Sequence, residues 1–308
     1  MVKVIESIWT ASLPRLEALP VELGSQASAT SYPYPSLRPT QSEQELQFPA
    51  LVLENSRTRL VVIPDLGGRI VSLVDLHSGH DVVTPSEIKA GGARGAYWNF
   101  GIQFALGEER LNSLGPVEWT LRESDEGPVL IILHELAAGT GLSWHLTIGL
   151  APDDPAVRLM ARVVNRTLAF RDGSSGLLFD QKVIALGQGT FAAGGLAVTS
   201  EDASFRESEN KLVVAAPLEP YGTDVWTATL RATPFGSLTA FSESAIVSLD
   251  AGDLSIYSED AHSNAKIVIL TEDQQTLEAP VNLEPLATTK LSLDQSIVAL
   301  KVIGSSGE

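Results

Sequence analysis

Alternating apolar and polar residues are the clearest pattern in the chain. In residues 142–148 (LSWHLTI), the even positions are apolar and Ser, His and Thr stand between them. Residues 157–163 (VRLMARV) alternate in the same way, with Arg158 and Arg162 at polar positions. Because successive side chains of a strand point to opposite faces of its sheet, both segments are predicted to be β-strands with one buried face.

Other apolar runs extend this pattern along the chain. Residues 129–134 are continuously apolar up to His134, which predicts a strand covered on both faces and places His134 in the core. Neither a helix of three or more turns nor a repeat of fixed period is indicated. The sequence therefore predicts an all-β fold, a large antiparallel β-sandwich. Further predicted strands lie at residues 51–53, 59–63, 69–74, 176–184, 225–232, 244–249, 254–258, 266–270 and 297–303.

The first part of the chain lacks this regularity. Residues 1–48 contain several prolines among Ser, Gln and Thr, so we expect an irregular N-terminal arm that packs on the sandwich, with one strand near residues 7–12. No linker divides the remainder. Residues 49–308 are accordingly predicted to form one domain.

Composition narrows the classes of partner. The net charge of −17 repels phosphate backbones and anionic lipids, so neither nucleic acid nor membrane is an expected partner. The chain has no Cys, and it shows no leader and no apolar stretch long enough to span a bilayer, so a soluble cytoplasmic protein is expected. Without a nucleotide- or phosphate-binding motif, no cofactor is predicted. A metal ion is left open.

Several motifs occur in an order that is familiar from a known superfamily. Residues 53–55 (LEN) precede residues 59–70 (RLVVIPDLGGRI), where Gly67 and Gly68 can take the positive φ that a tight connection between strands needs. These two segments resemble the sequence at the start of the domain in the galactose mutarotase-like superfamily, which includes the aldose 1-epimerases. They are most similar to a bacterial branch of unassigned function that is often fused to tetratricopeptide repeats. Residues 94–104, 115–119, 141–145 and 164–167 also resemble segments of that branch.

The resemblance implies a galactose mutarotase-like supersandwich that binds a sugar on its concave sheet face. Mutarotation needs a base for the anomeric hydroxyl and an acid for the ring oxygen, and the enzymes of the superfamily use Glu and His. Here Gln103 stands at the acidic position of the branch, and residues 105–111, where a His follows in the branch, contain none. A neutral amide cannot act as a base, so other groups must carry any such reaction.

Four residues are candidates for proton transfer. His145 stands on the polar side of its predicted strand, and Asp260 and His262 belong to the polar segment 258–266. Glu284 precedes Pro285, and this Glu-Pro pair weakly resembles a segment near the C-terminus of some epimerase relatives that contains their catalytic base. Structural alternatives stay open: His145 as a surface or core residue, and 258–266 as an ordinary charged turn.

Five further residues are candidates for sugar binding. Trp98 supplies a ring face for sugar C–H groups, and Asn99 and Gln103 supply polar partners for hydroxyls. Arg69 and Arg162 are candidate hydrogen-bond donors to the sugar. Arg69 has a structural alternative, in which it satisfies turn carbonyls or pairs with an acidic neighbour.

The sequence thus predicts a carbohydrate-binding protein, with aldose 1-epimerase-type isomerase activity as its candidate reaction. The alternatives are a catalytically inactive sugar-sensing or interaction module, and an accessory domain of a glycoside hydrolase system. The sequence does not identify the sugar or the oligomeric state.

Overall fold

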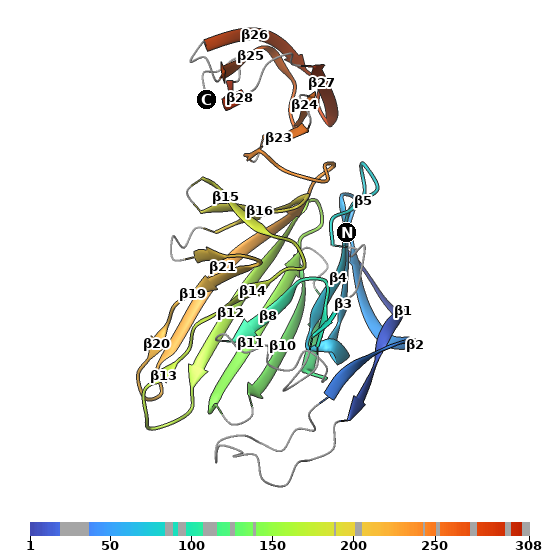
Figure 1. Ribbon diagram of the computed structural model, residues 1–308, viewed down its shortest axis with the longest axis vertical. Helices are drawn as coiled ribbons and strands as arrows, with labels where there is room; N and C mark the ends of the chain where they lie inside the picture. The colour runs from blue at the N-terminus through green and yellow to red at the C-terminus, as the bar shows by residue number, and fades with distance from the viewer. Residues whose placement is uncertain are drawn as a thin grey trace. The chain divides into compact units, whose positions relative to one another are not determined.

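The computed structural model shows a chain built almost entirely of β-strands (Figure 1). It divides into two compact units, Met1–Ala232 and Thr233–Glu308, each described here by itself. Within the described residues, no helix is long and apolar enough to cross a membrane. The described residues are 1–18, 37–83, 89–91, 97–106, 116–123, 127–137, 140–187, 189–200, 205–242, 244–250, 253–271, 276–292 and 297–303.

The largest sheet of the first unit has eight strands in the order β15-β16-β17-β21-β12-β11-β10-β9, and all of its ladders are antiparallel. Its strands are β9 (Glu118–Arg122), β10 (Val129–Ala137), β11 (Leu142–Leu150), β12 (Ala156–Asn165), β15 (Val183–Gly187), β16 (Thr190–Ala193), β17 (Leu196–Thr199) and β21 (Thr223–Ala232).

Smaller sheets complete the unit. A five-stranded sheet contains β1 (Lys3–Ala18), β2 (Leu37–Glu54), β3 (Thr58–Ile63), β4 (Arg69–Asp75) and β5 (His80–Asp81). A four-stranded sheet has the order β18-β19-β14-β8, with β8 (Gln103–Leu106), β14 (Ser175–Leu178), β18 (Phe205–Ser208) and β19 (Lys211–Val214). Two-stranded sheets pair β6 (Lys89–Gly91) with β7 (Tyr97–Asn99), and β13 (Arg171–Asp172) with β20 (Pro217–Leu218).

One hydrophobic cluster joins these sheets. It takes Leu53 and Leu60 from the five-stranded sheet, Phe104 from the four-stranded sheet, and Trp144 and Trp226 from the eight-stranded sheet. Burial of this apolar surface is the main favourable contribution to folding. The predicted all-β sandwich is therefore confirmed.

The connection between β3 and β4 has the predicted glycine conformation. A short 3-10 helix, Pro64–Leu66, leads into Gly67 and Gly68, each with a φ of 72°. A Cβ atom on Gly68 would also lie only 2.4 Å from Cδ1 of Leu133 in β10. Glycine is required there both by the backbone and by the approach of the facing sheet.

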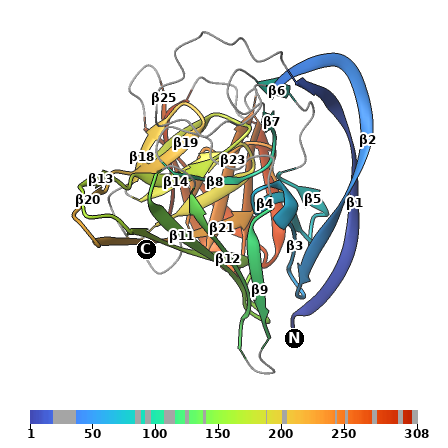
Figure 2. The same cartoon turned by 90° about the horizontal axis from the view of Figure 1, so that it is seen from below.

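The N-terminal segment is more regular than the sequence predicts. β1 and β2 form a long hairpin along β3, seen at the side of Figure 2. Leu13 is fully buried, and Trp9 stacks on Phe100 with ring centroids 5.5 Å apart. The expectation of an irregular arm is therefore wrong for residues 3–18 and 37–48, and residues 19–36 lie outside the described residues.

The second unit has its own core. Its four-stranded sheet contains β22 (Ala240–Phe241), β23 (Ala245–Asp250), β24 (Asp253–Ser258) and β27 (Ala287–Ser292). Its three-stranded sheet contains β25 (His262–Thr271), β26 (Thr276–Leu283) and β28 (Ile297–Ile303). Leu254 and Ile267 meet in a separate hydrophobic cluster. The predicted domain of residues 49–308 spans both units, and its behaviour as one folding domain stays a prediction.

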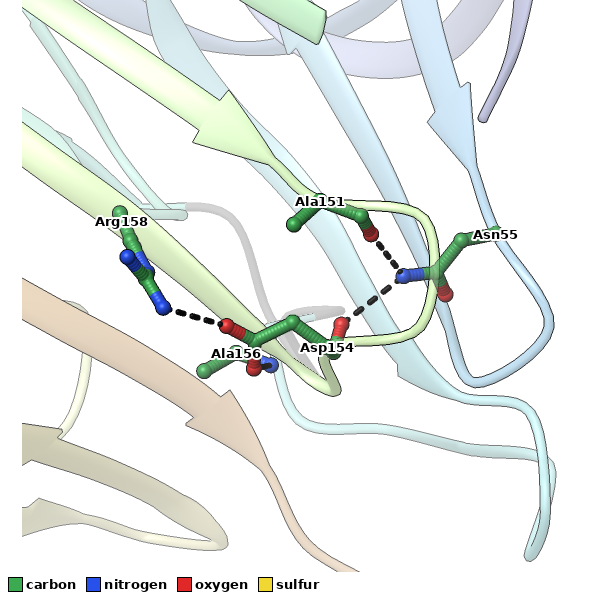
Figure 3. Close-up of polar contacts among 5 residues, drawn as sticks. All are labelled: Asn55, Ala151, Asp154, Ala156 and Arg158. Atoms are coloured by element: carbon green, nitrogen blue, oxygen red, sulfur yellow. Dashed lines mark hydrogen bonds and ion pairs between the residues drawn. The ribbon is translucent and has the colours of Figure 1, made fainter. Parts of the chain in front are cut away.

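Asn55 joins the turn after β2 to the turn after β11 (Figure 3). Its Nδ2 donates to the carbonyl oxygens of Ala151 and Asp154 at 2.7 and 2.8 Å. Its Oδ1 accepts from the backbone N–H groups of Arg57 and Thr58 at 2.8 and 2.7 Å. One buried amide therefore connects the five-stranded and eight-stranded sheets.

We expect Asn55→Ala to lower the free energy of unfolding by about 3 kcal/mol, because buried partners are left without hydrogen bonds. Urea denaturation followed by tryptophan fluorescence measures the change. The control is Arg158→Gln, which removes an ion pair to Asp154 from a side chain that is 74% exposed. This loss should cost less than about 1 kcal/mol. Equal stability of the two variants would show that Asn55 does not anchor the turns.

Candidate functional site

A row of polar side chains crosses one face of the eight-stranded sheet. Glu118 of β9, His134 of β10, His145 of β11 and Arg162 of β12 stand directly opposite one another in three successive ladders. Opposed residues of antiparallel strands point to the same face, with Cβ atoms about 4.5–5.5 Å apart. The positions on either side of His145 in β11 and of Arg162 in β12 are buried, so this row lies on the face that the core does not cover.

The two histidines of this row form a close pair. Their ring centroids are 5.6 Å apart and the rings are inclined by 25°. Oε2 of Glu118 lies 3.5 Å from Nδ1 of His134, so the two form an ion pair when the ring is protonated. The side chain of His134 is 36% exposed, and the prediction that His134 lies in the core is therefore wrong.

The reason for this error lies in the alternation of β10. Ile131 and Leu133 are fully buried, whereas Leu130, Ile132 and His134 are only half-buried. The apolar run is thus covered on one face, not on both. Apolar residues also occupy the more open face, which hides the alternation in the sequence.

His145 is the most perturbed group of the row. Burial lowers the pKa of its imidazole below the usual 6.5, and the charges of His134, Arg162 and Arg166 lower it further. Its Nδ1 is buried and has no hydrogen-bond partner within the described part of the chain. At neutral pH the ring is therefore predominantly uncharged and able to accept a proton.

A groove of about 490 Å³ contains this histidine pair. Its volume falls within the range of about 300–1,000 Å³ that is typical of small-molecule sites. The lining is mostly polar and comes from β9, β10, β11 and the segment after β12. The lining residues are Pro116, Val117, Glu118, His134, Glu135, Leu136, Ser143, His145 and Arg166.

The end of β12 is fixed by Asn165. Its side chain is fully buried, and its Nδ2 donates to the carbonyl oxygens of Ala169 and Glu219 at 2.7 and 2.8 Å. The backbone N–H of Arg166 donates to the carbonyl oxygen of Gly141 at 2.9 Å. These bonds hold Arg166 beside the start of β11, where it lines the groove.

Glu135 also lines the groove and was not predicted. Burial raises the pKa of its carboxyl group, and a 3.1 Å hydrogen bond from Nε1 of Trp144 partly offsets this. In the sequence Glu135 follows an apolar run, so nothing there distinguished it from an ordinary strand residue. Glu118 and Arg166 were missed for a similar reason, because only strand pairing for Glu118 and the backbone bond to Gly141 for Arg166 bring them near the histidines.

Three of the predicted sugar-binding residues lie in the interior. Arg69 is 1% exposed, and its Nη1 donates to the carbonyl oxygens of Trp98 and Phe100 at 2.6 and 2.9 Å. Its Nη2 donates to Oε1 of Gln103 at 3.1 Å, and Gln103 is itself buried. Nε1 of the buried Trp98 donates to the carbonyl oxygen of Pro14 at 3.1 Å. These residues form a structural cluster away from the groove, and their contact with a sugar stays a prediction.

Four further predicted residues belong to β7 or to the second unit. Asn99 is in β7, and its side chain lies outside the described residues. His262 stands opposite Leu283 in the second unit, and Asp260 and Glu284 are exposed in that unit. Of the predicted catalytic set, only His145 is in the first unit. The roles of the other three stay predictions.

We expect the ring of His145 to titrate below 6.5 and Arg162→Gln to move its midpoint upward, because a positive neighbour is removed. Because the folded protein binds this proton less readily than the unfolded chain, His145 makes the protein lose stability as the pH falls below 6.5. Carbon-detected NMR titration of the imidazoles measures the midpoint. Arg158→Gln is the control and should leave it unchanged. A midpoint at or above 6.5 would contradict the assigned environment.

Comparison with known proteins finds similarity in sequence and in fold. A family model for a domain of unknown function (DUF5107) matches residues 26–165. The structure is similar to a TPR-domain containing protein from Parabacteroides distasonis, with a TM-score of 0.52, 12% identity and 76% of this chain covered. The chain spans about half of that protein, 55% of its length. A galactose mutarotase-like protein from Lactobacillus casei matches with a TM-score of 0.29, 14% identity and coverage of 82% and 99% of the two chains. The Parabacteroides protein thus shares the fold with this chain.

Proposed function

We propose that the open face of β9–β12 binds a saccharide and catalyses aldose 1-epimerase-type proton transfer. One observation carries this proposal: a groove holds two imidazoles at 5.6 Å, and one of them has a lowered pKa and a ring nitrogen for which the described residues supply no partner. The motif resemblance to the mutarotase-like superfamily supports a sugar as the ligand.

The face offers the two kinds of contact that a sugar needs. Hydroxyl groups require donors and acceptors, which the imidazoles and the hydroxyl of Ser143 provide. Apolar C–H groups can pack on Leu136 and Met160, which are 64% and 48% exposed on the same side of the sheet. Leu136 stands opposite Ser143 in the ladder between β10 and β11.

The proposed reaction moves one proton at each imidazole. Neutral His145 removes the proton of the anomeric hydroxyl, while protonated His134, held by Glu118, donates a proton to the ring oxygen. The C1–O5 bond breaks, C1 becomes a carbonyl, and rotation about C1–C2 exposes its other face. Closure by the reverse transfers gives the opposite anomer and restores both histidines.

A sugar-sensing or interaction module is the second candidate. It is favoured by Gln103, which stands at the acidic position of the similar branch and accepts a hydrogen bond from Arg69 inside the protein. In this case the groove would bind a sugar without accelerating its interconversion.

We expect the protein to accelerate anomer interconversion of an aldose and His145→Gln to reduce this acceleration by about 100-fold or more, the usual contribution of a general base. Magnetisation-transfer NMR with several aldoses measures the rate. His77→Gln, at an exposed turn of the first unit, is the matched control and should keep full activity. Saccharide binding without acceleration would favour the sensing module. Absence of both would reject the site.

A further inference from the structure

The polar row changes charge from one end to the other. Glu118 is at the β9 end and Arg162 at the β12 end. With strands about 4.8 Å apart, the three ladders separate these ends by about 14 Å at the backbone. A ligand lying across the row therefore meets an acidic end and a basic end.

Two arginines form the basic end. Arg162 is exposed directly opposite His145, and Arg166 is held at the end of the same ladder by its bond to Gly141. Within the described residues, neither guanidinium has an ion-pair or hydrogen-bond partner. Arg158 lies on the same face of β12, but its guanidinium does have a partner, because it forms an ion pair with Asp154 at 3.0 Å.

The positive charges of Arg162 and Arg166 both act on His145 in the groove, whose pKa they lower. In the whole chain Asp and Glu outnumber Lys and Arg by 38 to 21, so most of its charge is negative. The Debye length at physiological salt is about 8 Å, so the distant negative charge is screened more strongly than the two arginines beside the groove. The local field at this end therefore favours an anion.

We propose that the saccharide bound by this face is acidic and that Arg162 and Arg166 hold its anionic group. This inference rests on the proposed function and names its substrate class. Guanidinium groups bind carboxylates and phosphates through paired, charge-assisted hydrogen bonds, so a hexuronate and a hexose phosphate share the required chemistry. The rest of the sugar then lies over His145 and His134, with its hydroxyls toward these rings.

The test compares ligands that differ in one charged group. Galacturonate, galactose 6-phosphate, galactose and galactosamine are titrated into the full chain at pH 7.5 and low salt, with isothermal calorimetry or NMR shifts as the readout. We expect an acidic sugar to bind at least about tenfold more tightly than galactose, and galactosamine to bind more weakly. Preference between the two acidic sugars identifies the carboxylate or the phosphate ester.

Variants assign the effect to the two arginines. The double variant Arg162→Gln/Arg166→Gln should reduce affinity for the acidic sugar to that for galactose, and Arg158→Gln should leave it unchanged. Thermal melting of each variant checks that the fold is intact.

The outcomes separate the two proposals. Equal affinity for acidic and neutral sugars, or unchanged affinity in the double variant, would overturn the acidic ligand and leave saccharide binding standing. Failure of every sugar to bind would overturn both.

Discussion

The geometry of the proposed site depends on how the eight-stranded sheet is buried. One face of β10–β12 closes the hydrophobic core, with Leu133, Leu146 and Ala161 at 2% exposure or less. Because side chains alternate, every second residue of these strands must point away from that core. This second face also carries apolar residues, but Glu118, His134, His145 and Arg162 are polar, and antiparallel pairing places them in a line. The face on which the polar row lies therefore follows from the same constraint that forms the core.

The sequence motifs that suggested a sugar site serve this fold directly. Gly68 allows close approach to Leu133, and the guanidinium of Arg69 lies 4.5 Å from the centre of the Phe100 ring. A buried guanidinium is tolerated only when its charge and donors are satisfied, and the carbonyl oxygens of Trp98 and Phe100 contribute to this. The cluster joins β4 to the segment that leads into β8. Motif residues can thus be recognisable because of folding, and the proposed site lies elsewhere in the first unit.

Local sequence patterns predicted where the strands lie better than which strands and residues pair with one another. The alternation at 142–148 and 157–163 gave β11 and β12 correctly, but no local pattern states which residues stand opposite His145. Prolines concealed the β1–β2 hairpin. β2 pairs with β3 only over Leu51–Glu54, so Pro49 lies where β2 has a partner on one side alone. A proline is tolerated in a strand with one open side when its nitrogen faces that side, because no ladder bond is then lost.

In the proposed site, the two arginines would connect ligand binding to proton transfer. Arg162 and Arg166 lower the pKa of His145 because their charges oppose a third positive charge nearby. An anionic group held between them would offset those charges, so ligand binding would raise the pKa of His145. A free imidazole with a low pKa is a weak base, and the complex makes it a stronger one at neutral pH. By linkage, a ligand that increases the proton affinity of His145 is itself bound more tightly when that proton is present. The charges that select the ligand would therefore also activate the group that acts on it.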